Sequence, residues 1–310
     1  MRTIDLFAGC GGLSLGFQNS GFEILRAYDN WDKAVECYSG NFDHEIYQQD
    51  LNDVNQLIDN LKHIQVDIII GGPPCQDFSH AGKRSEGARA GLTQSFSEVI
   101  SSVRPNWYVM ENVDRAVKSQ SYKSARKKFK ESGYGITEIV LDASYCGVPQ
   151  KRKRFFSIGK LDERDGFLSE RIKLSQSTTP MSIRDYFGNS LGFEYYYRHP
   201  RNYNRRGVFS IDEPAPTMRG VNRPIPAGYP GHAGDPVDIN DGVRSLTYQE
   251  RALIQTFPKN FKWVGSKTAI EQMIGNAVPV NLAAFVSRII RDYQIEEWRL
   301  IEEGSLAVNF

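Results

Sequence analysis

Short apolar stretches alternate with longer amphipathic stretches along the first half of the chain. Runs rich in β-branched and aromatic residues that close on Gly, Pro or Asp predict buried strands, whereas apolar residues three or four positions apart predict helices. Such alternation of strands and helices predicts a doubly wound α/β sheet. The expected strands are residues 3–8, 23–28, 45–49, 66–71, 106–111, 136–142 and 154–158, and the expected helices are residues 12–20, 31–40, 54–62, 92–103 and 120–131.

The pattern changes between about residues 165 and 265. Pro and Gly are dense between Pro214 and Pro236, which predicts irregular loops on a small sheet rather than helices. Residues 195–206 interleave tyrosines and asparagines with arginines. Arginine reads guanine edges and asparagine reads adenine, so this segment is a candidate for nucleic-acid contact, with a loop-rich structural insert as the alternative. From residue 279 to about residue 297, apolar side chains return at helical core spacing and predict a closing helix.

Composition narrows the class of protein. Of the 310 residues, 40% are hydrophobic and 24% are charged, which is ordinary for a soluble enzyme. No apolar run approaches the roughly 20 residues that span a bilayer, and the N-terminus lacks a signal-peptide pattern. A net charge of only +1 means that any nucleic-acid affinity must come from local basic patches. The cysteines lack disulfide or metal-ligand spacing, so we expect reduced thiols in the cytoplasm and no metal: Cys10, Cys37, Cys75 and Cys146.

A glycine-rich turn follows the first predicted strand. Gly9, Gly11 and Gly12 stand between that strand and the first predicted helix, a geometry that lets a nucleotide-like ligand approach the backbone. Asp29 ends the next strand about 20 residues later, where an acid accepts hydrogen bonds from ribose hydroxyls, and Asp50 follows the third strand. These features predict an adenosine-bearing cofactor, and the missing third spaced glycine argues against a nicotinamide one. The turn alone is weak support, because tight strand-to-helix connections have the same composition.

Cys75 lies in the most informative segment of the chain, Gly-Gly-Pro-Pro-Cys-Gln, directly after the β-branched strand that ends at Gly71. The prolines stiffen this loop and hold the thiol at the carboxyl edge of the sheet, where open α/β folds bind their ligands. A cysteine reacts as its thiolate, so Cys75 is a candidate nucleophile. A small hydrophobic residue in a buried turn is the alternative.

Two further groups of charged residues reach the same edge of the sheet. Glu111 ends an apolar strand, and apolar walls raise the pKa of a carboxyl toward the range useful for proton donation; a solvated loop carboxylate is the alternative. Arg152 and Arg154 point to one side of the strand that they enter, and Lys151 and Lys153 point to the other. Their position against an apolar strand favours contact with a phosphate or a base, although runs of cations are usually solvated.

Taken in order, these segments resemble the C5-cytosine-specific DNA methyltransferases, particularly the compact bacterial enzymes of restriction–modification systems. The resemblance covers essentially the whole chain, and short motifs in the same order make it specific. The matching segments are the glycine turn with Phe7 (first cofactor motif), the Cys75 loop (nucleophile motif), Glu111-Asn112-Val113 (acid motif), Gln150-x-Arg152-x-Arg154 (arginine motif), Arg244-x-Leu246-Thr247-x-x-Glu250 running to Phe257-Pro258 (penultimate motif) and Gly275-Asn276-Ala277-Val278-Pro279 (last motif).

The resemblance implies a mechanism for methylating cytosine at C5. The Cys75 thiolate adds to the neighbouring C6, because C5 is itself a poor nucleophile. Glu111 protonates or hydrogen-bonds the endocyclic ring nitrogen, Arg154 binds the ring carbonyl, and Arg152 supports it. The methyl group comes from S-adenosylmethionine, and a base removes the C5 proton so that Cys75 can leave. The target base must be flipped out of the duplex to reach such a pocket.

The resemblance also assigns binding residues. The expected cofactor contacts are Phe7, Gly9, Gly11, Gly12, Asp29, Asn30, Asp50, Leu51, Pro74, Leu92, Asn276 and Val278. In the loop at residues 79–92, glycines give hinge freedom and cations reach phosphates. The expected DNA contacts are Gln76, Ser79, Lys83, Arg84 and Arg89 near this loop, and Arg198, Arg201, Arg205, Arg206, Thr217 and Arg219 in the irregular span.

The chain departs from the family pattern in three places. After Asp29 the family often has an adenine-stacking aromatic, whereas here Asn30 comes first and Trp31 second. Gly87 stands where an acid is common in the loop, and Thr256 stands where glycine is usual. The adenine wall and the details of loop closure are therefore expected to differ.

The implied organisation is a catalytic domain of the S-adenosylmethionine-dependent methyltransferase type at residues 1–165 and 266–310, and a target-recognition domain at residues 166–265. We expect a monomer that binds double-stranded DNA, with a cognate endonuclease acting on the same site as a possible partner. Two alternatives stay open. One is an RNA-directed member of the family, and the other is an inactive DNA-binding scaffold, which should lack the nucleophile or the acid.

Overall fold

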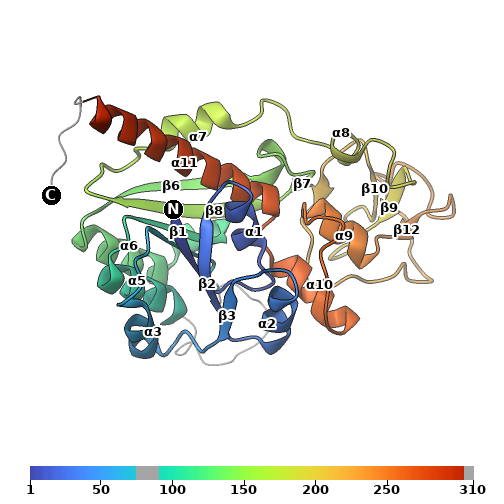
Figure 1. The fold of residues 1–310 in the computed structure, drawn as a ribbon. Helices are drawn as coiled ribbons and strands as arrows, with labels where there is room; N and C mark the ends of the chain where they lie inside the picture. Colours follow the sequence, from blue (N-terminus) through green and yellow to red (C-terminus); the bar gives the residue numbers. More distant parts are fainter. Residues whose placement is uncertain (75–90, 304–310) are drawn as a thin grey trace.

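The chain forms a large α/β lobe and a smaller lobe side by side (Figure 1). The computed structural model describes residues 1–74 and 91–303. The large lobe is built on a sheet with the strand order β3-β2-β1-β4-β5-β8-β6. Its strands are β1 (Arg2–Leu6), β2 (Glu23–Asp29), β3 (Glu45–Gln48), β4 (Ile68–Gly71), β5 (Trp107–Val113), β6 (Tyr134–Asp142) and β8 (Lys153–Leu161).

The sheet is parallel from β3 to β5, and β8 runs antiparallel between β5 and β6. Central strand β4 reads as a continuous β-branched run because both of its faces are covered, and its four residues are all buried. The doubly wound α/β fold predicted from the alternating pattern is confirmed. Each predicted strand and helix of this lobe is present, with ends shifted by a few residues.

Helices cover both faces of the sheet. On one face, α1 (Gly12–Gln18), α7 (Ser169–Ser175) and α11 (Val280–Glu302) pack through Leu13, Phe17 and Leu282 against β4 and β5. On the other face, α3 (Val54–Leu61), α5 (Gly91–Val103) and α6 (Gln120–Glu131) bury Phe96 and Phe129. In Figure 1, α11 crosses above the sheet and α3, α5 and α6 lie below it. Helix α2 (Asp32–Ser39) packs beside β3.

The closing helix belongs to the core. By length and composition the stretch Lys267–Leu300, which contains α10 (Lys267–Asn276) and most of α11, could cross a membrane, yet 78% of its most apolar window is buried inside the protein. Gly16 explains how α1 meets α11 so closely, since a Cβ there would lie 2.4 Å from Ala283 Cβ. Burial of this apolar face accounts for its composition.

The smaller lobe has little regular structure, as its Pro and Gly content predicts. Three short strands form one sheet: β9 (Tyr195–Tyr197), β10 (Val208–Ser210) and β12 (Arg244–Ser245). A parallel pair, β7 (Gln150–Lys151) with β11 (Ala215–Pro216), joins this lobe to the large one. Helices α8 (Ile183–Phe187) and α9 (Tyr248–Ile254) complete it.

Packing favours narrower limits for the smaller lobe than residues 166–265. Leu168 and Ile172 belong to the core of the large lobe under α11. Phe257 and Phe261 pack with Ala8 and Cys10 beneath the glycine turn. The separate core of the smaller lobe contains Ile183, Tyr196, Phe209, Ile211, Ala215, Met218, Leu246 and Ile254.

The penultimate motif has a structural role at the start of α9. Thr247 accepts a hydrogen bond from the Glu250 backbone N–H, and the Glu250 carboxylate accepts one from the Thr247 N–H, which forms a capping box. Arg244 pairs with the same carboxylate. At the end of this motif Thr256 has a φ of 61°, a left-handed conformation that explains why glycine suits the position.

Candidate active site

A cavity of about 510 Å³ opens at the carboxyl ends of β1, β2, β4 and β5. Parallel strands end at one edge of the sheet, and this edge is where open α/β folds bind ligands. Ten of the predicted cofactor residues line the cavity: Phe7, Gly9, Gly12, Asp29, Asn30, Leu51, Pro74, Leu92, Asn276 and Val278. Glu111 and Arg154 line the same cavity, so the structure brings two of the predicted catalytic residues together with these cofactor residues.

The glycine turn has an unusual backbone. Phe7 has a φ of 62°, in the left-handed region that costs a non-glycine residue free energy, and Gly9 and Gly11 have φ values of 56° and 95°. A Cβ at Gly9 would meet no atom within 4 Å, because Gly9 lines the open cavity. A Cβ at Gly12 would lie 2.3 Å from the Val278 carbonyl oxygen, so only glycine allows the last motif to approach. The turn is thus shaped to expose backbone to the cavity.

Asp29 holds the turn in place. Its Oδ2 accepts a hydrogen bond from the Gly9 N–H (2.8 Å), and its Oδ1 accepts one from the Trp31 N–H (2.9 Å). Burial raises the pKa of Asp29, and these backbone donors oppose the rise. The acid therefore joins the ends of β1 and β2 at the wall of the cavity.

Two predicted cofactor residues lie outside the cavity lining, and Trp31 lines it although it is not among the predicted contacts. Gly11 does not line the cavity, because it packs under Phe42, whose ring a Cβ would meet at 2.3 Å. Asp50 accepts a hydrogen bond from the Asn52 N–H (3.0 Å) in a turn and also lies outside the lining. Trp31 does line it, two residues after Asp29. The family pattern places the stacking aromatic directly after Asp29, whereas Trp31 stands one residue later, so it was not among the predicted contacts.

Glu111 is the acid of the cavity. It lies near the end of β5 with only 8% of its surface exposed, and burial raises the pKa of its carboxyl, while Arg154 and Arg152 oppose that shift. Arg154 Nε lies 2.9 Å from Glu111 Oε1, yet among the described residues this oxygen has no hydrogen-bond partner, so the contact is an ion pair without hydrogen-bond geometry. A buried carboxyl that keeps a free oxygen beside a cation is suited to act on a ligand.

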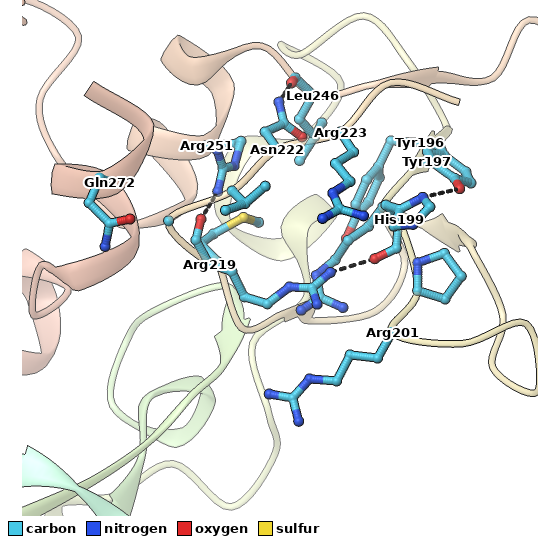
Figure 2. A pocket seen from close by; sticks show the side chains of 15 residues that line it. Tyr196, Tyr197, His199, Arg201, Arg219, Asn222, Arg223, Leu246, Arg251 and Gln272 are labelled. Carbon is cyan, nitrogen blue, oxygen red and sulfur yellow. Dashed lines mark hydrogen bonds between the residues drawn. The ribbon is translucent and has the colours of Figure 1, made fainter. Parts of the chain in front are cut away.

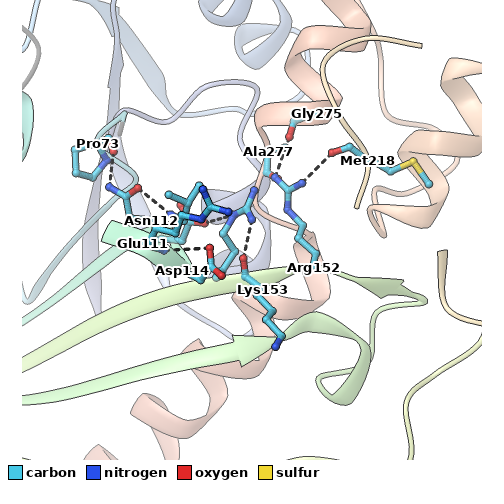
Figure 3. A network of polar contacts seen from close by, with 12 residues as sticks. Pro73, Glu111, Asn112, Asp114, Arg152, Lys153, Met218, Gly275 and Ala277 are labelled. Carbon is cyan, nitrogen blue, oxygen red and sulfur yellow. Dashed lines mark hydrogen bonds and ion pairs between the residues drawn. The ribbon is translucent and has the colours of Figure 1, made fainter. Parts of the chain in front are cut away.

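The loop before Cys75 is tied to the acid strand. Asn112 donates a hydrogen bond from Nδ2 to the Pro73 carbonyl (2.9 Å), as Figure 3 shows. A Cβ at Gly72 would lie 3.1 Å from Glu111 Oε2, so glycine leaves room for the carboxyl. Pro74 lines the cavity, and Cys75 follows it in the chain. The predicted residues Cys75, Gln76, Ser79, Lys83, Arg84 and Arg89 lie outside the described residues.

The structure places Arg152, the expected support of Arg154, in the protein interior beside the cavity. It is 1% exposed and does not line the cavity. Its guanidinium donates to the carbonyls of Met218 (3.0 Å), Gly275 (2.9 Å) and Ala277 (3.0 Å), contacts visible in Figure 3. These carbonyls belong to the smaller lobe and to the end of α10, so Arg152 positions three segments around the cavity.

A buried hydrogen-bond chain lies behind the glycine turn. Asp5 is fully buried, and its Oδ2 accepts from Ser14 Oγ (2.5 Å), which is 2.7 Å from Tyr38 Oη. Tyr38 Oη lies 2.6 Å from His44 Nε2. Burial is the main cause that raises the pKa of Asp5 to about 7, and Asp29 adds to it. The other oxygen of Asp5 has no partner.

We expect Asp5 to make the protein less stable as the pH rises. Its pKa is raised by folding, so the folded state holds the proton more tightly than the unfolded state, and the free energy of unfolding falls between about pH 4 and pH 7. Asp5→Asn should remove this part of the slope, so that the variant gains roughly 2 kcal/mol relative to wild type between pH 5 and pH 8. Urea unfolding at several pH values measures the slope. Parallel slopes would contradict the assignment, whatever the constant cost of the substitution.

A second cavity of about 470 Å³ lies in the smaller lobe (Figure 2). Three of the predicted DNA contacts line it: Arg198, Arg201 and Arg219. Arg223 and Arg251 also line it and were not among the predicted contacts. Arg205 is exposed and does not line it.

Two other predicted DNA contacts are engaged within the protein. Arg206 pairs with Glu213 and lies over the Phe209 ring, 4.4 Å from its centroid. Thr217 donates its hydroxyl hydrogen bond to the Lys151 carbonyl (2.7 Å).

Comparisons with known proteins agree with the geometry. The model of the C-5 cytosine-specific DNA methylase family matches residues 1–291. The chain is 54% identical over 301 residues to Type II methyltransferase M.HindV of Haemophilus influenzae, which covers 96% of this chain and 99% of that relative. It is 51% identical over 294 residues to Type II methyltransferase M.HgiDI of Herpetosiphon aurantiacus, covering 94% and 95%. The fold is similar to that of the S. pombe Dnmt2 methyltransferase, with a TM-score of 0.71, 17% identity and coverage of 94% of this chain and 99% of that one.

Proposed function

The chain belongs to the C-5 cytosine-specific DNA methylase family, and from this premise we infer how its residues serve the reaction. It is a DNA (cytosine-5-)-methyltransferase, and its similarity to Type II methyltransferases places it in restriction–modification. The observation that carries the residue assignment is the buried Glu111–Arg154 pair, which lines the same cavity as the glycine turn and Pro74.

The catalytic roles follow from this arrangement. Cys75, next to Pro74, adds to C6 of the flipped cytosine. Glu111 donates a proton or a hydrogen bond to the ring nitrogen, because burial favours its neutral form. Arg154, whose guanidinium lies beside the Glu111 carboxyl, binds the ring carbonyl. Arg152 keeps the arginine strand, the smaller lobe and α10 in register and touches no reacting atom.

The cavity fits S-adenosylmethionine. Exposed backbone at Gly9, the acid Asp29 and the indole of Trp31 meet at one wall, the combination that a nucleoside with a ribose requires. A volume of about 510 Å³ is within the usual range for ligand sites. When bound, S-adenosylmethionine supplies an electrophilic methyl group.

We expect Trp31→Ala to weaken S-adenosylmethionine binding. Stacking of a base on an aromatic ring contributes about 1–3 kcal/mol, so the dissociation constant should rise roughly 10-fold. Calorimetric titration of the cofactor measures it. Trp298→Ala is the matched control, because Trp298 is 51% exposed on α11 and does not line the cavity. Equal affinities of the Trp31 variant and wild type would show that another group forms the wall.

The two-lobed shape suits duplex DNA. The recognition segment is the smaller lobe, which carries the arginine-lined cavity, and the large lobe carries the chemistry. We propose that the enzyme acts in the bacterial cytoplasm as a monomer and protects sites that a cognate endonuclease would cut. The division into a catalytic domain at residues 1–165 and 266–310 and a recognition domain at residues 166–265 is part of this proposal, although Leu168, Ile172, Phe257 and Phe261 pack in the large lobe.

Base-resolution mapping of methylated cytosines in host DNA, with and without expression of the chain, tests the function. We expect C5 methylation at one short sequence, lost in cells without the gene. Methylation of RNA alone would favour the RNA-directed alternative, and no methylation with intact DNA binding would favour the inactive scaffold.

A further inference from the structure

We propose that the arginine-lined cavity of the smaller lobe is a guanine-reading pocket, in which Arg219 contacts the base edge and Arg201 contacts a phosphate. This inference rests on the proposed function, since it assumes that duplex DNA is the substrate.

The charge balance of the cavity is the first observation. Arg198, Arg201, Arg219 and Arg223 line it with Arg251, and no acidic residue among residues 1–74 and 91–303 lines it. Within the described ranges, the one lining arginine that pairs with a carboxylate is Arg251, through Glu271. Concentrated like charge destabilises a protein unless a ligand neutralises it. The cavity is therefore suited to a ligand rich in hydrogen-bond acceptors.

Burial and mutual repulsion act on these arginines. Burial, together with repulsion from Arg219 and Arg201, lowers the pKa of Arg198 to about 10. The pKa of Arg219 is lowered by burial and then by Arg201 and Arg223. These guanidinium groups stay protonated at neutral pH and repel one another. Their repulsion is a cost in the free protein that a base edge or a phosphate would relieve.

Geometry separates the arginines into two kinds. Arg219 is half-buried, and one nitrogen of its guanidinium donates to the His199 carbonyl, which fixes the plane of the group. Arg198 is held in the same way by the Thr217 carbonyl (2.9 Å). A fixed, partly desolvated guanidinium can present its remaining N–H pair to guanine O6 and N7. Arg201 is exposed, and Figure 2 shows it extending from the rim, while Arg219 and Arg223 point toward the middle of the cavity.

The cavity also lies beside the catalytic one. Gln272 of α10 lines the arginine cavity, whereas Met273 and Asn276 line the catalytic cavity. Gln272 Nε2 donates to Asn276 Oδ1 (2.8 Å), so one helical turn separates the two sites. A Cβ at Gly275 would lie 2.1 Å from the Gly220 N, which shows how closely the Arg219 segment approaches α10. A duplex that delivers a base to one cavity is near the other.

Selection of duplexes from a pool randomised around a cytosine tests the inference by binding alone. Wild type should retain guanine at one position against adenine by about 5- to 150-fold, the range of a good bidentate arginine–guanine contact. Arg219→Gln should lose this preference and keep the others. Arg219→Lys should lose it while keeping the salt dependence of binding, because it keeps the charge without the planar fork.

Two variants serve as comparisons. Arg201→Ala should weaken all duplexes alike and lower the slope of log affinity against log salt by about one. Arg288 is an exposed arginine of α11, and Arg288→Ala should change neither the affinity for duplexes nor the salt slope. The melting temperature of Arg219→Gln without DNA should equal or exceed that of wild type, since repulsion is relieved.

The opposite outcomes are distinct. If Arg219→Gln weakens every duplex equally and keeps the guanine preference, Arg219 is a phosphate contact and the inference is wrong. A clearly lower melting temperature of that variant would assign Arg219 a structural role and also overturn it. If the protein selects guanine but methylates no cytosine, the proposed methyl transfer is wrong, and the guanine-reading role of the arginine-lined cavity is retained.

Discussion

Cys75→Ser should abolish methyl transfer, with a fall in the single-turnover rate of at least about 10⁴-fold. The serine hydroxyl is protonated at neutral pH and adds to C6 far more slowly than a thiolate. Binding of duplex DNA should stay close to that of wild type. Single-turnover methylation and a DNA-binding titration of the same preparation measure the two effects.

The other cysteines make poor alternatives as nucleophiles. Burial raises the pKa of Cys146 to about 12, and it raises the pKa values of Cys10 and Cys37 as well, so these thiols stay protonated. Cys146→Ala, which lies in the core away from the cavity, is the matched control and should keep its rate.

A covalent probe makes the test of Cys75 independent of turnover. Wild type should form a stable adduct with DNA that carries 5-fluorocytosine at the target, because fluorine cannot leave as the proton does. The serine variant should form none. An active Cys75→Ser enzyme would refute the assignment.

Glu111→Gln should lower the single-turnover rate by about 10²–10³ while S-adenosylmethionine binds within a few-fold of wild type. Glutamine keeps the size of the side chain beside Gly72 and Arg154 and loses the transferable proton. The cofactor wall at Gly9, Asp29 and Trp31 is left intact. Calorimetric titration beside single-turnover methylation separates the two effects.

The pH dependence gives a second readout for Glu111. Burial raises the pKa of this carboxyl, so its neutral form persists to higher pH than in an exposed glutamate. The wild-type chemical step should slow as the pH rises through that pKa, and the glutamine variant should lack this fall. Glu138 of β6 pairs with Arg126 of α6 and does not line the cavity, so Glu138→Gln should behave as wild type. Loss of cofactor binding with an unchanged rate at saturation would make Glu111 a cofactor ligand instead.

The sequence was sufficient to predict the fold and the main elements of the large lobe. Strand and helix periodicity depend on neighbouring residues, so β4 and α11 could be read from apolar spacing alone. Turn chemistry likewise predicted the glycine turn, and the apolar run placed Glu111 near the end of β5, which extends two residues further, to Val113. The parallel order of the strands then brings both to one edge, which is why their residues meet.

The short strands of the smaller lobe and helix α10 could not be predicted from apolar spacing, because long-range contacts stabilise them. The strands β9, β10 and β12 hold only two or three residues each, too few for a period to show. Helix α10 is set by packing against the turn and the smaller lobe. The limits of the smaller lobe depend on which core each segment joins, and composition does not record that.

Individual roles at the site were decided by tertiary contacts. Arg152 and Arg154 are two positions apart on one strand, yet one is buried among three carbonyls and the other faces Glu111 in the cavity. Arg206 is neutralised by Glu213, while Arg219 and Arg223, separated from Arg198 in the sequence, join it around one cavity. The sequence by itself determined which chemical groups the protein carries and at which edge of the sheet they gather. The tertiary structure alone decided which charges are compensated and which face a cavity, because burial and pairing arise between segments that the chain brings together only on folding.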